Sequence, residues 1–180
     1  MYMSVGTGRL VVLALAAALA ACASLNVDRM MPTTQPVHVH RFDGTLHVLP
    51  VTGAQPEQFG GAARISNEMF REALVSALRK SNLFRRVETN QAGDYQLRAE
   101  ITTQDQTTQG LDYVSLLGVR YRIVDTRSGA ELWRREINSR HLVAVSQALS
   151  GATRTVTAQE ATVRDNLTRM LTALAAVEPK

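Results

Sequence analysis

The feature that most constrains this chain is an apolar segment near the N-terminus, which ends at the protein's single cysteine. A short polar start ends at Arg9, ten apolar residues run to Leu19, and the small residues Ala20 and Ala21 precede Cys22. This order is the layout of a secretory signal. At about 1.5 Å per residue, ten helical residues span about half of a ~30 Å hydrocarbon core. We therefore do not expect a permanent transmembrane helix.

The sequence Leu-Ala-Ala-Cys at 19–22 resembles the lipobox of bacterial lipoproteins. The resemblance implies that the signal peptide 1–21 is removed and that Cys22 carries a diacylglycerol and a fatty acid. In that family an aspartate after the cysteine often retains a lipoprotein in the inner membrane, whereas this chain has Ala23. The resemblance thus implies an anchor in the outer membrane, facing the periplasm. The alternative, an ordinary signal peptide, would expose an unpaired thiol in an oxidising compartment.

The mature chain, 22–180, is long enough for one domain with a single core. Without Arg9 it carries 19 basic and 16 acidic residues, a net charge of +3. This charge is too small for a nucleic-acid-binding surface, and we expect no nucleic-acid partner. Polar residues and prolines without periodicity follow Cys22. We predict a flexible tether over 22–36 and a periplasmic domain over 37–180.

Two stretches have the one-sided periodicity of amphipathic helices. The first is predicted to begin after Ser66, a plausible N-cap, and to end near Asn82. The second is predicted to begin at Thr157, where Glu160 would complete a capping box. Both faces are broad enough to cover a sheet.

Alternation and turn residues predict several strands around these helices. We expect extended structure at 37–51, 83–88, 95–101, 111–126 and after Gly129. Asp43-Gly44 is expected to form a turn, Gly118 a bulge, and the glutamine- and threonine-rich 102–110 a mobile hairpin connection. This order predicts an α+β fold, a small antiparallel or mixed sheet with two helices packed on one face.

The strongest local signal is the hairpin turn Arg-Ser-Gly at 127–129. Its register places Arg122 opposite Arg134, Arg120 opposite Glu136 and Val124 opposite Leu132. One face of the hairpin is then apolar and buries Trp133. The other face carries arginines, and we predict that this face holds Arg98, Arg120, Arg122 and Arg134.

The run Asn67–Leu78, followed by Ser81–Val87, resembles the helix-to-strand unit of a periplasmic superfamily. That superfamily includes the TolB N-terminal domain, the curli-secretion lipoprotein and the lipoprotein activators of penicillin-binding proteins. The likeness continues through 94–101 and 121–133 and covers roughly 45–140. It implies a small α/β domain that binds other proteins and has no catalytic residues.

We also looked for residues that could carry catalysis or hold a metal. His38 and His40 share one side of an extended segment and His47 lies nearby, but no Cys, Asp or Glu accompanies them at ligand spacing. Gly60-Gly61 lacks the lysine of a phosphate loop. We therefore expect no enzyme activity, no metal and no cofactor other than the covalent lipid on Cys22.

Two kinds of function remain open. In the first, the domain is an accessory protein that binds an envelope protein by strand addition at a sheet edge or through the first helix. In the second, the four arginines bind an anionic component such as lipopolysaccharide or a phospholipid headgroup. We expect the first, because the resemblance points to it.

Overall fold

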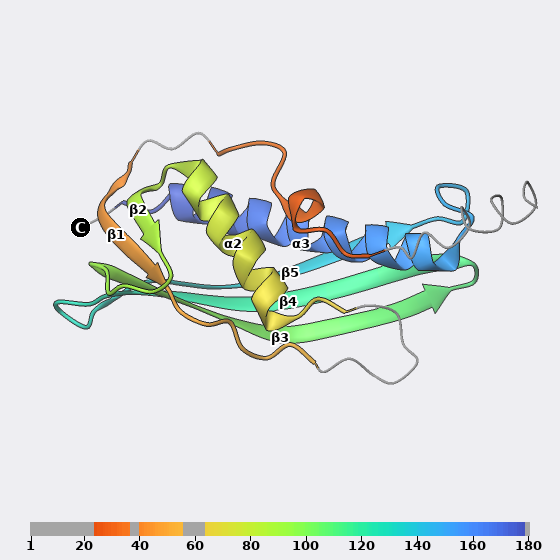
Figure 1. The fold of residues 1–180 in the computed structure, drawn as a ribbon, viewed down its shortest axis with the longest axis horizontal. Helices are drawn as coiled ribbons and strands as arrows, with labels where there is room; N and C mark the ends of the chain where they lie inside the picture. Colours follow the sequence, from red (N-terminus) through yellow and green to blue (C-terminus); the bar gives the residue numbers. More distant parts are fainter. Residues whose placement is uncertain (1–23, 37–39, 56–63, 179–180) are drawn as a thin grey trace, which may run out of the picture.

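The structure, a computed structural model, describes residues 24–36, 40–55 and 64–178. These residues form one five-stranded sheet with both helices on the same face (Figure 1). The α+β class and the placement of the helices are thus confirmed. The lipobox residues 19–22, His38 and Gly60-Gly61 lie outside the described residues.

The sheet has the strand order β2-β1-β3-β4-β5. Strand β1 is parallel to both of its neighbours. Helix α2 forms the crossover from β1 to β2, and β3 begins opposite the end of β1. Strands β3, β4 and β5 are antiparallel. In chain order the elements are the 3₁₀ helix η1 (Val27–Met30), β1 (Phe42–Val48), α2 (Asn67–Ser81), β2 (Phe84–Glu88), β3 (Tyr95–Gln109), β4 (Asp112–Asp125), β5 (Glu131–Val143) and α3 (Gly151–Ala175).

Helix α2 begins and ends close to its predicted limits. The Ser66 hydroxyl accepts a hydrogen bond from the Met69 amide at 3.1 Å, so Ser66 is the N-cap. Asn82 adopts the left-handed conformation, with φ of 55°, and ends the helix. The apolar face of α2 is buried against the sheet.

Helix α3 begins earlier than predicted. Its N-cap is Ser150, whose hydroxyl accepts from the Thr153 amide, and not a residue near Thr157. Thr155 and Val156 are already buried in the helix. The predicted capping box was wrong because Glu160, buried mid-helix, accepts a hydrogen bond from a distant amide instead.

Three predicted interruptions of the sheet were also wrong. The segment 102–110 is not a mobile connection, because β3 continues to Gln109 and pairs with β4 over its whole length. Asp43-Gly44 lies inside β1, where the register shifts without a turn. The bulge expected at Gly118 lies in the partner strand, between Ile101 and Thr103.

The β4–β5 hairpin has most of its predicted register. Gly129 has φ of +73°, and its amide donates to the Asp125 carbonyl at 2.9 Å. Trp133 is 6% exposed, so its predicted burial is confirmed. Val124 pairs with Glu131, not with Leu132, because the register shifts by one residue at this point.

The chain before β1 is not a free tether over its described part. Met30 in η1 is fully buried between the two helices. The Asn26 side chain accepts from the Asp28 amide at 2.8 Å, and the Asn26 amide donates to Glu160 Oε1 at 2.9 Å. Arg164 donates to the Arg29 carbonyl. Residues 26–31 are therefore part of the folded domain.

A polar contact joins α3 to the centre of the sheet. Asn166, fully buried, accepts a hydrogen bond from the Tyr121 hydroxyl at 2.6 Å. Its amide group donates to the Ile137 carbonyl at 2.8 Å.

Among the described residues, no helix combines the length and the apolar composition needed to cross a membrane.

Candidate functional site

The face of the sheet turned away from α2 and α3 carries all four predicted arginines. No helix of the described chain lies on this face, which we call the open face (Figure 1). Arg98 pairs with Arg122, and Arg122 pairs with Arg134, so three arginines occupy adjacent positions on β3, β4 and β5. We call these three residues the arginine row. The structure thus brings these residues together, and the binding of an anion to them stays a prediction.

The fourth arginine belongs to a neighbouring row of mixed charge. Arg120 lies between Glu100 and Glu136, with N–O distances of 3.1 and 3.2 Å. Glu100, Arg120 and Glu136 are direct cross-strand partners. Arg120 is therefore neutralised by two carboxylates of the protein itself.

The arginine row is only partly neutralised. The Glu131 carboxylate contacts the Nε atom of Arg122 and the Nη2 atom of Arg134, and the N–O distance to Arg134 is 2.7 Å. Within the described residues Arg98 has no carboxylate partner, and it is exposed. Like charges on directly opposed positions of neighbouring strands repel one another. An anion bound at Arg98 would therefore relieve a repulsion that the domain leaves in place.

The irregularity in β5 explains why Glu131 faces the row. With strict alternation Glu131 would share the core face with Trp133, and Leu132 would point to the open face. The register shift makes Leu132 an extra residue that packs against the core, and Glu131 moves to the open face. Sequence alternation therefore missed this acid.

A shallow hollow of about 330 Å³ lies over these side chains. It is lined by Arg98, Glu100, Arg120, Arg122 and Arg134. A guanidinium group offers paired N–H donors that match carboxylate or phosphate oxygens. The site thus has hydrogen-bond donors suited to an anion, and every side chain in its lining ends in a charged group.

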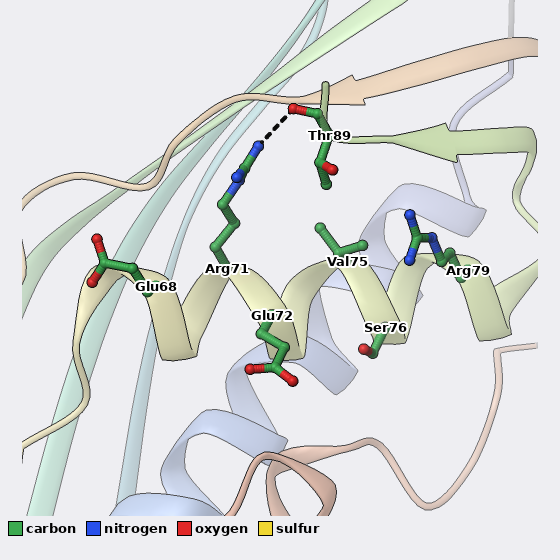
Figure 2. A pocket seen from close by; sticks show the side chains of 7 residues that line it. All are labelled: Glu68, Arg71, Glu72, Val75, Ser76, Arg79 and Thr89. Atoms are coloured by element: carbon green, nitrogen blue, oxygen red, sulfur yellow. Dashed lines mark hydrogen bonds between the residues drawn. The ribbon is translucent and has the colours of Figure 1, made fainter. Parts of the chain in front are cut away.

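A second hollow, of about 340 Å³, lies between α2 and β2 (Figure 2). Its lining residues are Glu68, Arg71, Glu72, Val75, Ser76, Arg79 and Thr89. Arg71 donates to the Val48 and Thr89 carbonyls at 2.7 and 3.0 Å, and Arg79 donates to the Val87 carbonyl at 3.2 Å. Arg71 thus ties α2 to the ends of β1 and β2, and Arg79 ties α2 to β2.

Three aspartates lie near Tyr95 at one end of the sheet. Asp125 accepts hydrogen bonds from the amides of Ser128 and Arg127, and the bonds from Ser128 lower the pKa of Asp125 most. Burial raises the pKa of Tyr95, with the nearby aspartates adding to the effect. The Asp125 carboxylate, through its hydrogen bonds to Arg127 and Ser128, therefore stabilises the β4–β5 turn.

Two of the histidines considered as metal ligands, His40 and His47, lie in the described part of the chain. His40 lies 3.8 Å from the Glu178 carboxylate, while His47 is part of β1. In the part of the chain that the structure describes, no three His, Cys, Asp or Glu side chains are grouped as metal ligands would be. The absence of metal and of catalysis remains a prediction.

No protein-family model matches the sequence, and no curated protein matches it. Solved structures do share the fold. Protein XCC0632 from Xanthomonas campestris, of the DUF330 family model, is 17% identical over 81% of this chain and 91% of its own, with a TM-score of 0.56. Hypothetical protein CT253 from Chlamydia trachomatis is 15% identical over 74% of this chain and 99% of its own, with a TM-score of 0.54.

PelC from Paraburkholderia phytofirmans, solved as a dodecamer, is 16% identical over 81% of this chain and 95% of its own, with a TM-score of 0.51. Weaker matches, with TM-scores of 0.41 to 0.48, are described as bacterial lipoproteins. The chain thus shares the fold of several bacterial proteins. None of the three named structures is described as a TolB, curli-secretion or penicillin-binding-protein activator protein, so that closer relationship remains a prediction.

Proposed function

We propose that this protein is a lipid-anchored accessory protein of the outer membrane, and that its arginine row binds an acidic region of an envelope protein facing the periplasm. The resemblance of 19–22 to a lipobox supports the anchor. The observation that supports the binding site is Arg98, a cation without a carboxylate partner in the described chain, next to Arg122 on an uncovered sheet face.

The lining of the hollow favours a protein over a carried lipid. A site that carries a lipid must cover its acyl chains with apolar side chains. The hollow at the arginine row has only charged residues in its lining and is open to solvent. Carboxylates on a partner surface need no such cover, and they match the guanidinium groups directly.

The test is affinity purification of the full chain from cross-linked cells, with partners identified by mass spectrometry. The test variant replaces Arg98, Arg122 and Arg134 with glutamine. The control variant replaces Arg85, Arg86 and Arg127, which are exposed away from the row and carry the same total charge. We expect the test variant to recover at least tenfold less of its partner and the control to recover a normal amount. Equal recovery from both variants would refute the site.

A second function is favoured by the geometry of the same guanidinium groups. Phosphate oxygens fit paired N–H donors as well as carboxylates do, so lipopolysaccharide or a phospholipid headgroup is the alternative ligand. Binding of purified lipopolysaccharide that the three-arginine variant loses, with no protein partner recovered, would establish it. Recovery of further copies of this chain would indicate self-assembly, the state in which PelC was solved.

A further inference from the structure

Two large apolar side chains of the described chain project into solvent at the same end of the molecule. Leu111, in the turn between β3 and β4, is 71% exposed, and Leu149, in the connection from β5 to α3, is 90% exposed. The Val145 amide donates to the Asp112 carboxylate at 3.0 Å, which ties the connection to the turn. Figure 1 shows the β3–β4 turn and the β5–α3 connection at the end of the molecule where α3 begins.

Several polar groups of the β5–α3 connection are already hydrogen-bonded. Residues 144–150 contain no charged side chain. Arg154 donates to the carbonyls of Ala148 and Leu149 at 2.6 and 2.8 Å, and the Gln147 side chain accepts from the Ala144 amide at 2.8 Å. Backbone groups that enter a bilayer without partners are costly. This connection can present Leu149 to lipid without such a cost at these groups.

The N-terminal chain approaches the same part of the molecule. The Asn26 amide is held by Glu160, in the first half of α3. From Cys22 to Asn26 the chain can reach about 14 Å at most. From Glu160 back to Gly151, where α3 begins, the helix rises about 1.5 Å per residue, or roughly 14 Å. A lipid on Cys22 would therefore keep Asn26, and with it the first half of α3, within about 14 Å of the bilayer surface.

We propose that the end formed by the β3–β4 turn and the β5–α3 connection docks on the bilayer surface and inserts Leu111 and Leu149 among the lipids. This inference rests on the proposed lipid anchor at Cys22. The strand from Leu111 to Arg122 advances about 3.4 Å per residue, roughly 37 Å in all. The arginine row is then held away from the headgroups of the membrane that carries the anchor.

The test uses the full chain, purified from bacterial membranes after processing and reconstituted in vesicles of phosphatidylethanolamine and phosphatidylglycerol with brominated acyl chains. Leu111→Cys and Leu149→Cys each add one thiol for a bimane label, because Cys22 is the only native cysteine and is blocked by its thioether. Ser128→Cys, in the turn at the opposite end of the sheet, is the matched control. All three sites are in connections between elements.

We expect brominated lipid to reduce the emission of the labels at 111 and 149 at least twofold and to leave the label at 128 unchanged. Vesicle flotation of the same samples reports the anchor separately. A chain that floats with no quenching at either leucine position overturns the docking and leaves the anchor standing. A chain that does not float overturns the anchor, and the docked orientation with it.

Discussion

Asn166 is the residue on which the packing of α3 most depends. It is fully buried, accepts from the Tyr121 hydroxyl, and donates to the carbonyls of Ile137 and Leu117. A buried polar group left without a partner costs about 1–3 kcal/mol. We predict that Asn166→Ala lowers the free energy of unfolding by about 3 kcal/mol, measured by urea denaturation.

The exposed Thr172 on the same helix provides the control for this substitution. Thr172→Ala should change the free energy of unfolding by less than about 0.5 kcal/mol, as exposed substitutions usually do. A loss below about 1 kcal/mol for Asn166→Ala would show that the buried contact contributes little.

Tyr121 makes the stability of the protein depend on alkaline pH. Complete burial raises the pKa of its hydroxyl well above the ordinary value of about 10. The native state therefore holds this proton more strongly than the unfolded chain does. The stabilisation is fully present below pH 10 and is lost as pH rises above 10, because the unfolded chain ionises first.

We predict that the free energy of unfolding falls between pH 10 and pH 11.5, and that Tyr121→Phe makes this decline shallower by up to about 1.4 kcal/mol per pH unit. Burial also raises the pKa of Tyr113 and Tyr95, so a smaller slope should remain. Denaturation curves at several pH values measure both slopes. Identical slopes for wild type and Tyr121→Phe would contradict the prediction.

At the scale of elements, η1 decides where the folded domain begins. Met30 is fully buried against both helices, although its neighbourhood has the composition of a tether. Truncation of a buried methionine to alanine costs about 2–5 kcal/mol. We predict a loss of this size for Met30→Ala in thermal or urea unfolding, whereas Thr33→Ala, on an exposed side chain, should have no measurable effect. Equal stability of the two variants would mean that residues 26–31 add nothing to the stability of the domain and act as a tether.

Elements with a local signal could be predicted from the sequence, and elements that depend on distant partners could not. The Ser66 cap and the periodicity of α2, and the glycine of the 127–129 turn, depend on nearby residues alone. The second half of β3 is polar, and its structure depends on distant partners. It pairs with β4, and the buried Gln104 amide donates to the Ile65 carbonyl, just before α2, at 3.0 Å. The early start of α3 likewise depends on tertiary burial of Thr155 and Val156.

The same distinction holds for the candidate site. Alternation placed Arg98, Arg122 and Arg134 on one face, because side-chain direction in a strand has a period of two. The alternation pattern predicted Glu136 as the acid that neutralises an arginine on this face, and it missed Glu131. The extra residue Leu132 in β5 moves Glu131 to the opposite face from the one that strict alternation predicts. The pairing of Glu100, on β3, with Arg120 could be found only once the register of β3 with β4 was known.

At the scale of the whole molecule, the docked orientation separates two contacts of opposite physical character. Leu111 and Leu149 would contact lipid through apolar surface, which salt does not weaken. The arginine row would contact its partner through charge on an exposed face. Salt weakens such a contact, because the Debye screening length falls to about 3 Å at 1 M ionic strength. The two contacts should therefore respond differently to the same change in salt.

We predict that raising sodium chloride from 0.05 to 1 M releases an acidic probe, poly-L-glutamate, from the vesicle-bound protein but leaves the bimane label at position 149 quenched by brominated lipid. Flotation of labelled probe and bimane emission, measured on the same vesicles, give both quantities. The variant with Arg98, Arg122 and Arg134 replaced by glutamine should bind little probe at either salt concentration. Loss of probe and of quenching together would mean that one charged surface contacts both the probe and the membrane, and that the arginine row faces the bilayer.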